Sequence, residues 1–235
     1  YFPEILNIFN KFPKAKAAAG YVPHESNIEK ESQVEQLARR VFLLGGRLKA
    51  NDSSIVSSYG NRYPKSISGI IKADWFPGDN MAFKKEIFEK IQCDENLLGY
   101  TVAEDIDISY RVSQIFPNSV YITPHAKLTH RYSPQARYPT ARLAYLNQVD
   151  HFYFNFKNLN RTAKEKLAFA WSLAGITALR ILQLVKTRKK EDALKLKFYF
   201  SSLSYCIKNL GSIRRGNVRS FDSQIKATTQ KLKSQ

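Results

Sequence analysis

The sequence predicts an α/β fold followed by a basic helical tail, and three observations lead to this division. Short apolar runs alternate with helical patterns up to about residue 140, and every later signal is helical. Residues 1–150 hold 19 basic and 16 acidic side chains, whereas residues 151–235 hold 18 and 4. The chain has 235 residues, 43% of them hydrophobic, which is enough for a buried core. We expect one domain over 1–140 and a tail over 141–235.

The first elements follow from apolar spacing and from helix breakers. Apolar residues on one side of 5–9 predict a helix that ends before Pro13, and the apolar run 17–22 predicts a strand. Periodic apolar residues over 28–42 predict a second helix closed by Gly45 and Gly46. The stretch 51–68 is rich in Ser, Asn, Gly and Pro and is expected to be a loop.

The next elements surround the candidate site. A strand is expected over 80–83 and a helix over 84–91. A third helix is expected to begin near Glu104, and two short strands are expected at 120–123 and 126–130, separated by Pro124.

The C-terminal part is expected to contain helices over 143–159, 162–185 and 191–210. Thr162 and Glu165 have the spacing of a capping box, which marks the start of the second of these helices. Gly211 is the expected stop of the last one.

Two features of the whole chain limit its class. Cys93 and Cys206 are too few and too far apart for a disulfide framework or a four-ligand zinc site. The first residues lack the cationic and apolar segments of a secretory signal. The chain also begins without Met, which indicates a fragment.

Three carboxylates, Glu104, Asp105 and Asp107, lie at the start of the third predicted helix. Taken alone they are explained by the preference for acidic residues at a helix N-terminus. About 25 residues upstream, however, the small-residue loop that begins at Gly78 leads into a strand and a helix. A permissive backbone close to a carboxylate cluster is typical of a site that admits a polar ligand.

Together the two motifs resemble those of the family 2 glycosyltransferases, which have the GT-A fold. The match covers roughly residues 65–135 and rests on their order along the chain. The matching residues are Gly78, Asn80, Met81 and Ala82, followed by Glu104, Asp105, Asp107 and Arg111.

The resemblance implies that residues 1–140 are the latter part of a GT-A nucleotide-sugar transferase domain. The implied reaction transfers a sugar, with inversion, from a nucleotide-sugar donor to a hydroxyl of a glycan or lipid-linked acceptor, as in the synthesis of surface or exported polysaccharide or glycolipid. Asp105 would be the general base that deprotonates the acceptor. The implied substrate-binding residues are Gly78, Asp79, Asn80, Met81, Glu104, Asp107 and Arg111.

The resemblance also implies Mg²⁺ or Mn²⁺ on the donor diphosphate, held by an Asp-x-Asp motif. Residues 1–73 contain no such motif, and the opening helix looks like the one that follows it in the family, so the chain is expected to start just after its metal site. His130 matches a position that is a metal or diphosphate ligand in some members. A lone histidine there is more often simply a strand-end residue.

The basic tail predicts an anionic membrane surface as a partner, at the cytoplasmic face of a membrane. The apolar run 167–185 is long enough to span a bilayer, but Arg180 makes a spanning helix marginal. The basic cluster 186–190 and the aromatic residues of the tail favour helices that lie on the surface. The alternative is a soluble helical subdomain with a solvated basic face.

Two other function classes stay open at this point. One is a non-catalytic basic module that binds a membrane or nucleic acid, although no specific nucleic-acid-binding signature accompanies the charge. The other is a metal-dependent phosphoester hydrolase that would use carboxylates and one histidine as ligands. Its candidate ligands are Asp74, Asp79, Glu104, Asp105, Asp107 and His130.

Overall fold

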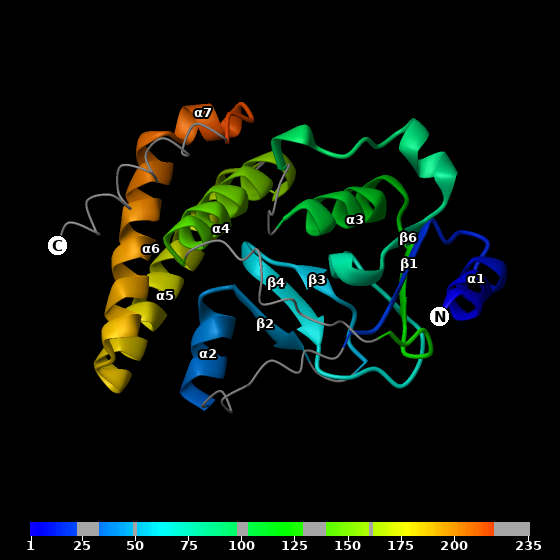
Figure 1. Ribbon diagram of the computed structural model, residues 1–235, viewed down its shortest axis with the longest axis horizontal. Coiled ribbons are helices and arrows are strands. Elements are labelled where there is room, and N and C mark those ends of the chain that lie inside the picture. Colours follow the sequence, from blue (N-terminus) through cyan, green and yellow to red (C-terminus); the bar gives the residue numbers. More distant parts are fainter. Residues whose placement is uncertain (23–32, 49–50, 98–102, 129–139, 160–161, 219–235) are drawn as a thin grey trace. The chain divides into compact units, whose positions relative to one another are not determined.

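The protein separates into two compact units in the computed structural model (Figure 1). Unit 1 comprises Tyr1–Asp94 and Glu104–Tyr132, and unit 2 comprises Glu95–Ala103 and Ser133–Gln235. The structure describes residues 1–22, 33–48, 51–97, 103–128, 140–159 and 162–218. Unit 1 mixes helices with short strands, whereas the described part of unit 2 is helical. This agrees with the predicted class, an α/β region followed by a helical one.

A four-stranded mixed sheet with the order β5-β7-β1-β6 organises unit 1. Its strands are β5 (Ile71–Lys72), β7 (Val120–Thr123), β1 (Ala17–Gly20) and β6 (Ala82–Phe83). β1 runs parallel to β7, with Gly20 opposite Thr123, and antiparallel to β6. The strands predicted at 17–22 and 120–123 are therefore confirmed.

Alternate residues of β1 and β7 point to opposite faces of this sheet, as the period of two in a strand requires. On one face, Ala18 and Tyr121 pack with Ile5 and Ile8 of α1 (Phe2–Lys11). On the other face, Ala17, Ala19, Val120 and Ile122 share a core with Ile108 and Val112 of α3 (Glu104–Ile115). A helix thus covers each face, and α3 begins at Glu104 as predicted.

A second sheet was not expected. β2 (Leu44–Leu48), β4 (Tyr59–Pro64) and β3 (Ile55–Val56) form a three-stranded sheet in the order β2-β4-β3. The predicted loop over 51–68 is therefore wrong, as is the helix stop at Gly45 and Gly46, because both glycines lie in β2. A Cβ at Gly45 would lie 2.7 Å from the amide nitrogen of Asn61, so the close approach of β2 to β4 requires glycine there.

Three shorter elements also differ from the prediction, and a fourth is described only in part. Asn80 ends a 3₁₀ turn, η1 (Gly78–Asn80), and only Ala82–Phe83 of the predicted strand forms β6. The helix predicted over 84–91 is the 3₁₀ helix η2 (Lys85–Glu89). Residues 126–128 form no strand, and 129–130 lie outside the described residues. The second predicted helix is described from Gln33 onward as α2 (Gln33–Val41).

Unit 2 contains α4 (Thr140–Phe154), continued by the π-helical turn η4 (Asn155–Leu159), and then α5 (Ala163–Thr187), α6 (Lys190–Lys208) and α7 (Leu210–Arg214), with η3 (Glu95–Leu97) from the earlier segment. The capping box at the start of α5 is confirmed, since the Thr162 amide donates to Oε2 of Glu165 at 2.7 Å and the Glu165 amide donates to the Thr162 hydroxyl. Gly211 lies inside α7 and does not end the helical region.

The helices of unit 2 pack through aromatic rings and buried hydroxyl groups. Phe169 of α5 makes edge contacts with Phe152 and Phe156, at centroid distances of 5.0 and 5.9 Å. The Tyr145 hydroxyl of α4 and the Ser201 hydroxyl of α6 lie 2.6 Å apart. These contacts determine which sides of α5 and α6 are covered within the unit.

Candidate functional site

The candidate site lies at the carboxyl end of β1, where the chain leaves the central sheet of unit 1. In α/β folds this end of parallel strands is the usual position of ligand sites. Gly20 is the last residue of β1, and its backbone meets the side chain of Asn80. The site is therefore built on the sheet itself and on the turn η1.

Asn80 joins η1 to β1 through two hydrogen bonds. Its side-chain NH₂ donates to the Gly20 carbonyl at 3.1 Å, and its side-chain oxygen accepts the Gly20 amide at 3.1 Å. The Asn80 carbonyl in turn accepts a 2.5 Å hydrogen bond from the Tyr1 hydroxyl. Asn80 is only 7% exposed, so its amide group positions the loop.

Asp105 joins η1 to the start of α3. Its Oδ2 accepts a hydrogen bond of 2.8 Å from the Gly78 amide, and its Oδ1 accepts one of 2.8 Å from Ile106. A Cβ at residue 78 would lie 3.0 Å from the Cβ of Asp105, so glycine allows this close approach. The two motifs that the sequence separates by 27 residues thus meet at one carboxylate.

The environment of Asp105 makes it more basic than an ordinary carboxylate. Burial raises its pKa from 3.8 to about 6, and the negative charge of Glu104 acts in the same direction. The amide hydrogen bonds from Ile106 and Gly78 oppose this rise. Such a group is ionised at neutral pH and can take a proton from a nearby hydroxyl.

Ser109 attaches the same end of α3 to the segment before η1. Its hydroxyl donates to the Asp105 carbonyl at 2.6 Å and accepts the amide of Phe76 at 3.4 Å. Phe76 has no exposed surface and lies in the core beneath the loop. The sequence analysis missed Ser109 and Gly20. The only signals that could have found them are their positions: Ser109 lies four residues after Asp105, and Gly20 ends an apolar strand.

Asp107 and Arg111 form an ion pair along α3. The Arg111 guanidinium contacts Oδ2 of Asp107 at 2.8 Å and also donates to the carbonyl of Gln92 at 2.8 Å. Asp107 is 1% exposed, so this pair helps to attach α3 to the chain that follows η2.

The remaining predicted residues differ in their surroundings. Glu104 and Asp79 are exposed, whereas Met81 is half-buried and packs against the main core of unit 1. Burial is the main cause of the raised pKa of the Tyr63 hydroxyl, and the negative charge of Asp79 raises it further. His130 lies outside the described residues.

A metal site would need converging ligands among these residues. Within the described ranges, no group of three or more His, Cys, Asp or Glu side chains converges as an ion site requires. The carboxylate of Asp105 is instead held by backbone amides. The described residues therefore do not by themselves provide the Mg²⁺ or Mn²⁺ site that the resemblance implies.

Comparison with known proteins gives no significant match to a family model, to a curated protein or to a solved structure.

Proposed function

We propose that this chain carries the acceptor side of an inverting, GT-A-type glycosyltransferase that uses a nucleotide-sugar donor, with Asp105 as its general base. One observation supports this most directly: the Gly78 amide lies 2.8 Å from Oδ2 of Asp105. The resemblance requires the glycine-containing loop and the acidic helix to act on one sugar, and groups that act on one sugar must converge.

In the proposed reaction, Asp105 accepts the proton of an acceptor hydroxyl while the hydroxyl oxygen attacks C1 of the donor sugar. The bond from C1 to the diphosphate oxygen breaks, the nucleoside diphosphate leaves with that electron pair, and the configuration at C1 inverts. A base with a pKa of about 6 is ionised at pH 7.5 and still holds a proton better than an exposed carboxylate does.

The roles of the neighbouring residues follow from their contacts. Gly78 and Ile106 orient the carboxylate of Asp105, and Asn80 holds the loop on Gly20. Asp107 and Arg111 act as positioning residues, because their charged groups are engaged with each other and with Gln92. This assignment routes the proton through Asp105 and requires no metal ligand from the described residues.

The experiment measures release of nucleoside diphosphate by the native protein from a panel of UDP- and GDP-sugars, with simple glycosides as acceptors. Asp105→Asn should lower turnover at least about a hundredfold, because it removes proton acceptance with little change of volume, and donor affinity should stay nearly the same. Asp107→Asn should lower turnover by a smaller factor. Glu89→Gln, which removes one carboxylate that is exposed and outside the site, is the control. Full turnover of the Asp105→Asn protein would overturn the assignment.

A further inference from the structure

We propose that α5 lies in the plane of an anionic lipid bilayer, with one apolar side inserted at the acyl boundary and the cations at its two ends on the headgroups. This proposal concerns unit 2 alone and does not depend on the proposed chemistry of Asp105. It rests on an exposed apolar stripe, on the charges at both ends of that stripe, and on the contacts that occupy the other side of α5.

The stripe follows one side of α5 for almost its whole length. Its large members are exposed, namely Leu167 at 72%, Trp171 at 47%, Ile181 at 43%, Leu182 at 48% and Val185 at 62%. Ala174 and Ala178, also exposed, continue the spacing of three and four residues between Trp171 and Ile181. No charged residue interrupts this side between Lys164 and Lys186.

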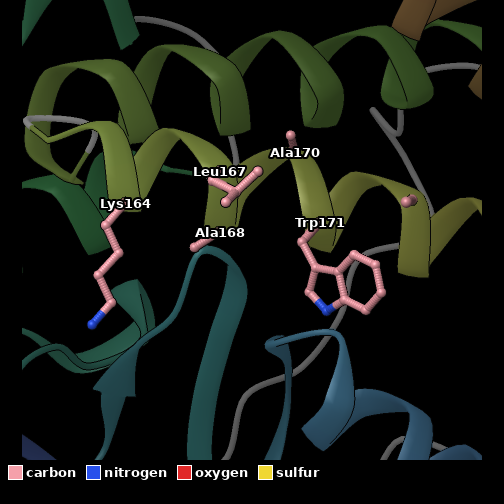
Figure 2. Close-up of a pocket in the computed structure, with 6 residues that line it drawn as sticks. Lys164, Leu167, Ala168, Ala170 and Trp171 are labelled. Carbon is pink, nitrogen blue, oxygen red and sulfur yellow. The ribbon is translucent and has the colours of Figure 1, made fainter.

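A hollow of about 520 Å³ adjoins the first half of the stripe. It is lined by Lys164, Leu167, Ala168, Ala170, Trp171 and Ala174. Figure 2 shows Lys164 and Trp171 projecting toward the same side of the helix, with Ala168 between them. An apolar surface with a cation at one end and an indole at the other is the pattern that helices present to the boundary between headgroups and acyl chains.

The charges at the ends of the stripe identify an anionic surface as its partner. Lys164 and Lys166 are exposed in the first turns, and four more exposed cations follow the stripe: Lys186, Arg188, Lys189 and Lys190. The acidic groups among them are already engaged: Glu165 caps the helix start, and Glu191 and Asp192 contact Lys195. The ends of α5 therefore carry a net positive charge that complements anionic headgroups.

The opposite side of α5 decides between lying on a membrane and crossing it. By length and composition α5 is able to span a bilayer. However, its Thr177 hydroxyl lies 2.9 Å from the Tyr199 hydroxyl of α6, and the Arg180 guanidinium lies over the Tyr199 ring at 4.7 Å. A spanning α5 would therefore take α6 into the hydrocarbon together with Lys195 and Lys197, which is costly. Lying in the plane leaves all of these groups in water.

Cosedimentation of the whole chain with vesicles tests the proposal. Vesicles of phosphatidylcholine with 30% phosphatidylglycerol should bind the chain more strongly than phosphatidylcholine alone, and part of this binding should persist in 0.5 M NaCl because the stripe is apolar. Replacing Trp171, Ile181 and Leu182 by Ser should remove the salt-resistant part, lowering binding in 0.5 M NaCl more than about tenfold. These side chains are exposed, so the fold should tolerate the change.

The charge contribution is tested with a matched pair of triple variants. Lys186, Lys189 and Lys190 changed to Gln should weaken binding at low salt by about fivefold per residue, on the order of a hundredfold in all. The same change at Lys14, Lys65 and Lys85, three exposed cations of unit 1, should weaken it far less. Equal losses in the two variants would overturn the proposal. Complete loss of vesicle binding in 0.5 M NaCl, with equal affinity for a DNA duplex, would also overturn it and favour nucleic acid.

Trp171 reports the depth of the helix directly. In a Trp75→Phe background it is the single tryptophan, because the chain has two. In the plane of the boundary, lipids with a nitroxide near the headgroup should quench its fluorescence more than lipids with a nitroxide at the chain end. A spanning α5 would place Trp171, four residues from the helix centre, only about 6 Å from the midplane. Stronger quenching by the deep nitroxide, or no quenching by either, would refute in-plane docking.

Discussion

Replacing Asp105 by Asn should remove a pH dependence of stability that this carboxyl group imposes on unit 1. Burial raises the pKa of Asp105 from 3.8 to about 6 in the native state. Between these two values the native protein holds a proton that the unfolded chain has already released. The free energy of unfolding must therefore fall as the pH rises through this window, and the loss is nearly complete about one unit above pH 6.

The two pKa values give the size of the effect. From pH 4.5 to pH 7.5 the wild-type protein should lose about 2 kcal/mol of unfolding free energy through Asp105 alone. The Asn side chain does not titrate, so the variant escapes this loss. Its amide can accept only one of the two N–H groups, from Gly78 and Ile106, that the carboxylate accepts, which costs about 1–3 kcal/mol at every pH. The decisive quantity is thus the difference between variant and wild type, which should shift by about 2 kcal/mol in favour of Asn between the two pH values.

Urea unfolding followed by the fluorescence of Trp75 measures this difference. Trp75 belongs to unit 1, is 7% exposed and donates its indole N–H to the carbonyl of Arg62, so it reports on this unit. A Trp171→Phe background removes the signal of unit 2. Glu89→Gln controls for the removal of one negative charge. Parallel stability curves for wild type and the Asp105→Asn variant from pH 4.5 to 7.5 would refute the assignment of a raised pKa to Asp105.

Three further substitutions test one contact each in the candidate site, in the second sheet and at the start of α5. Asn80→Ala should lower the unfolding free energy of unit 1 by about 2–4 kcal/mol, since it leaves both backbone groups of Gly20 without partners. The control Asp79→Ala, at an exposed position, should lower it by less than about 1 kcal/mol, and similar losses in the two variants would contradict the role given to Asn80. Gly45→Ala should lower the unfolding free energy by more than about 2 kcal/mol in the same Trp75 assay, because the new Cβ would meet the Asn61 backbone. The control is Gly69→Ala, which should unfold like wild type because a Cβ there meets no atom within 4 Å. Thr162→Ala should lower the thermal stability of unit 2, measured by circular dichroism, by about 1 kcal/mol, and an unchanged midpoint would show that the capping box contributes nothing.

Much of unit 1 could be predicted because its signals are local. Ile5 and Ile8 lie one turn apart on the buried side of α1, and the acidic residues at Glu104 mark the start of α3. The second sheet could not be predicted in the same way. Short strands that contain Gly and Asn, within a stretch rich in Ser, look like a loop until their partners are known. β2 approaches β4 closely because Gly45 has no side chain to meet the neighbouring backbone.

In the candidate site, too, local signals could be predicted and long-range contacts could not. Residue types and spacing were sufficient to single out the loop at Gly78 and the acidic start of α3. The resemblance predicted that the two converge. The hydrogen bond between Gly78 and Asp105 and the attachment of Asn80 to Gly20 were not contained in that pattern, because both join segments far apart in the chain. The pKa of Asp105 likewise depends on burial, which arises only when those segments pack together.

The tail shows the same division between composition and packing. Its charge, its helices and its capping box follow from the order of residues, since helix periodicity and caps act within a few positions. Composition favoured helices on a membrane surface over a spanning helix, with a soluble subdomain as the alternative, but it could not show which side of α5 is free. The packing of α5 against Tyr199 places Arg180 beside α6 and leaves the apolar stripe exposed. Which side of a helix stays free depends on its partners, and those contacts form only in the folded unit.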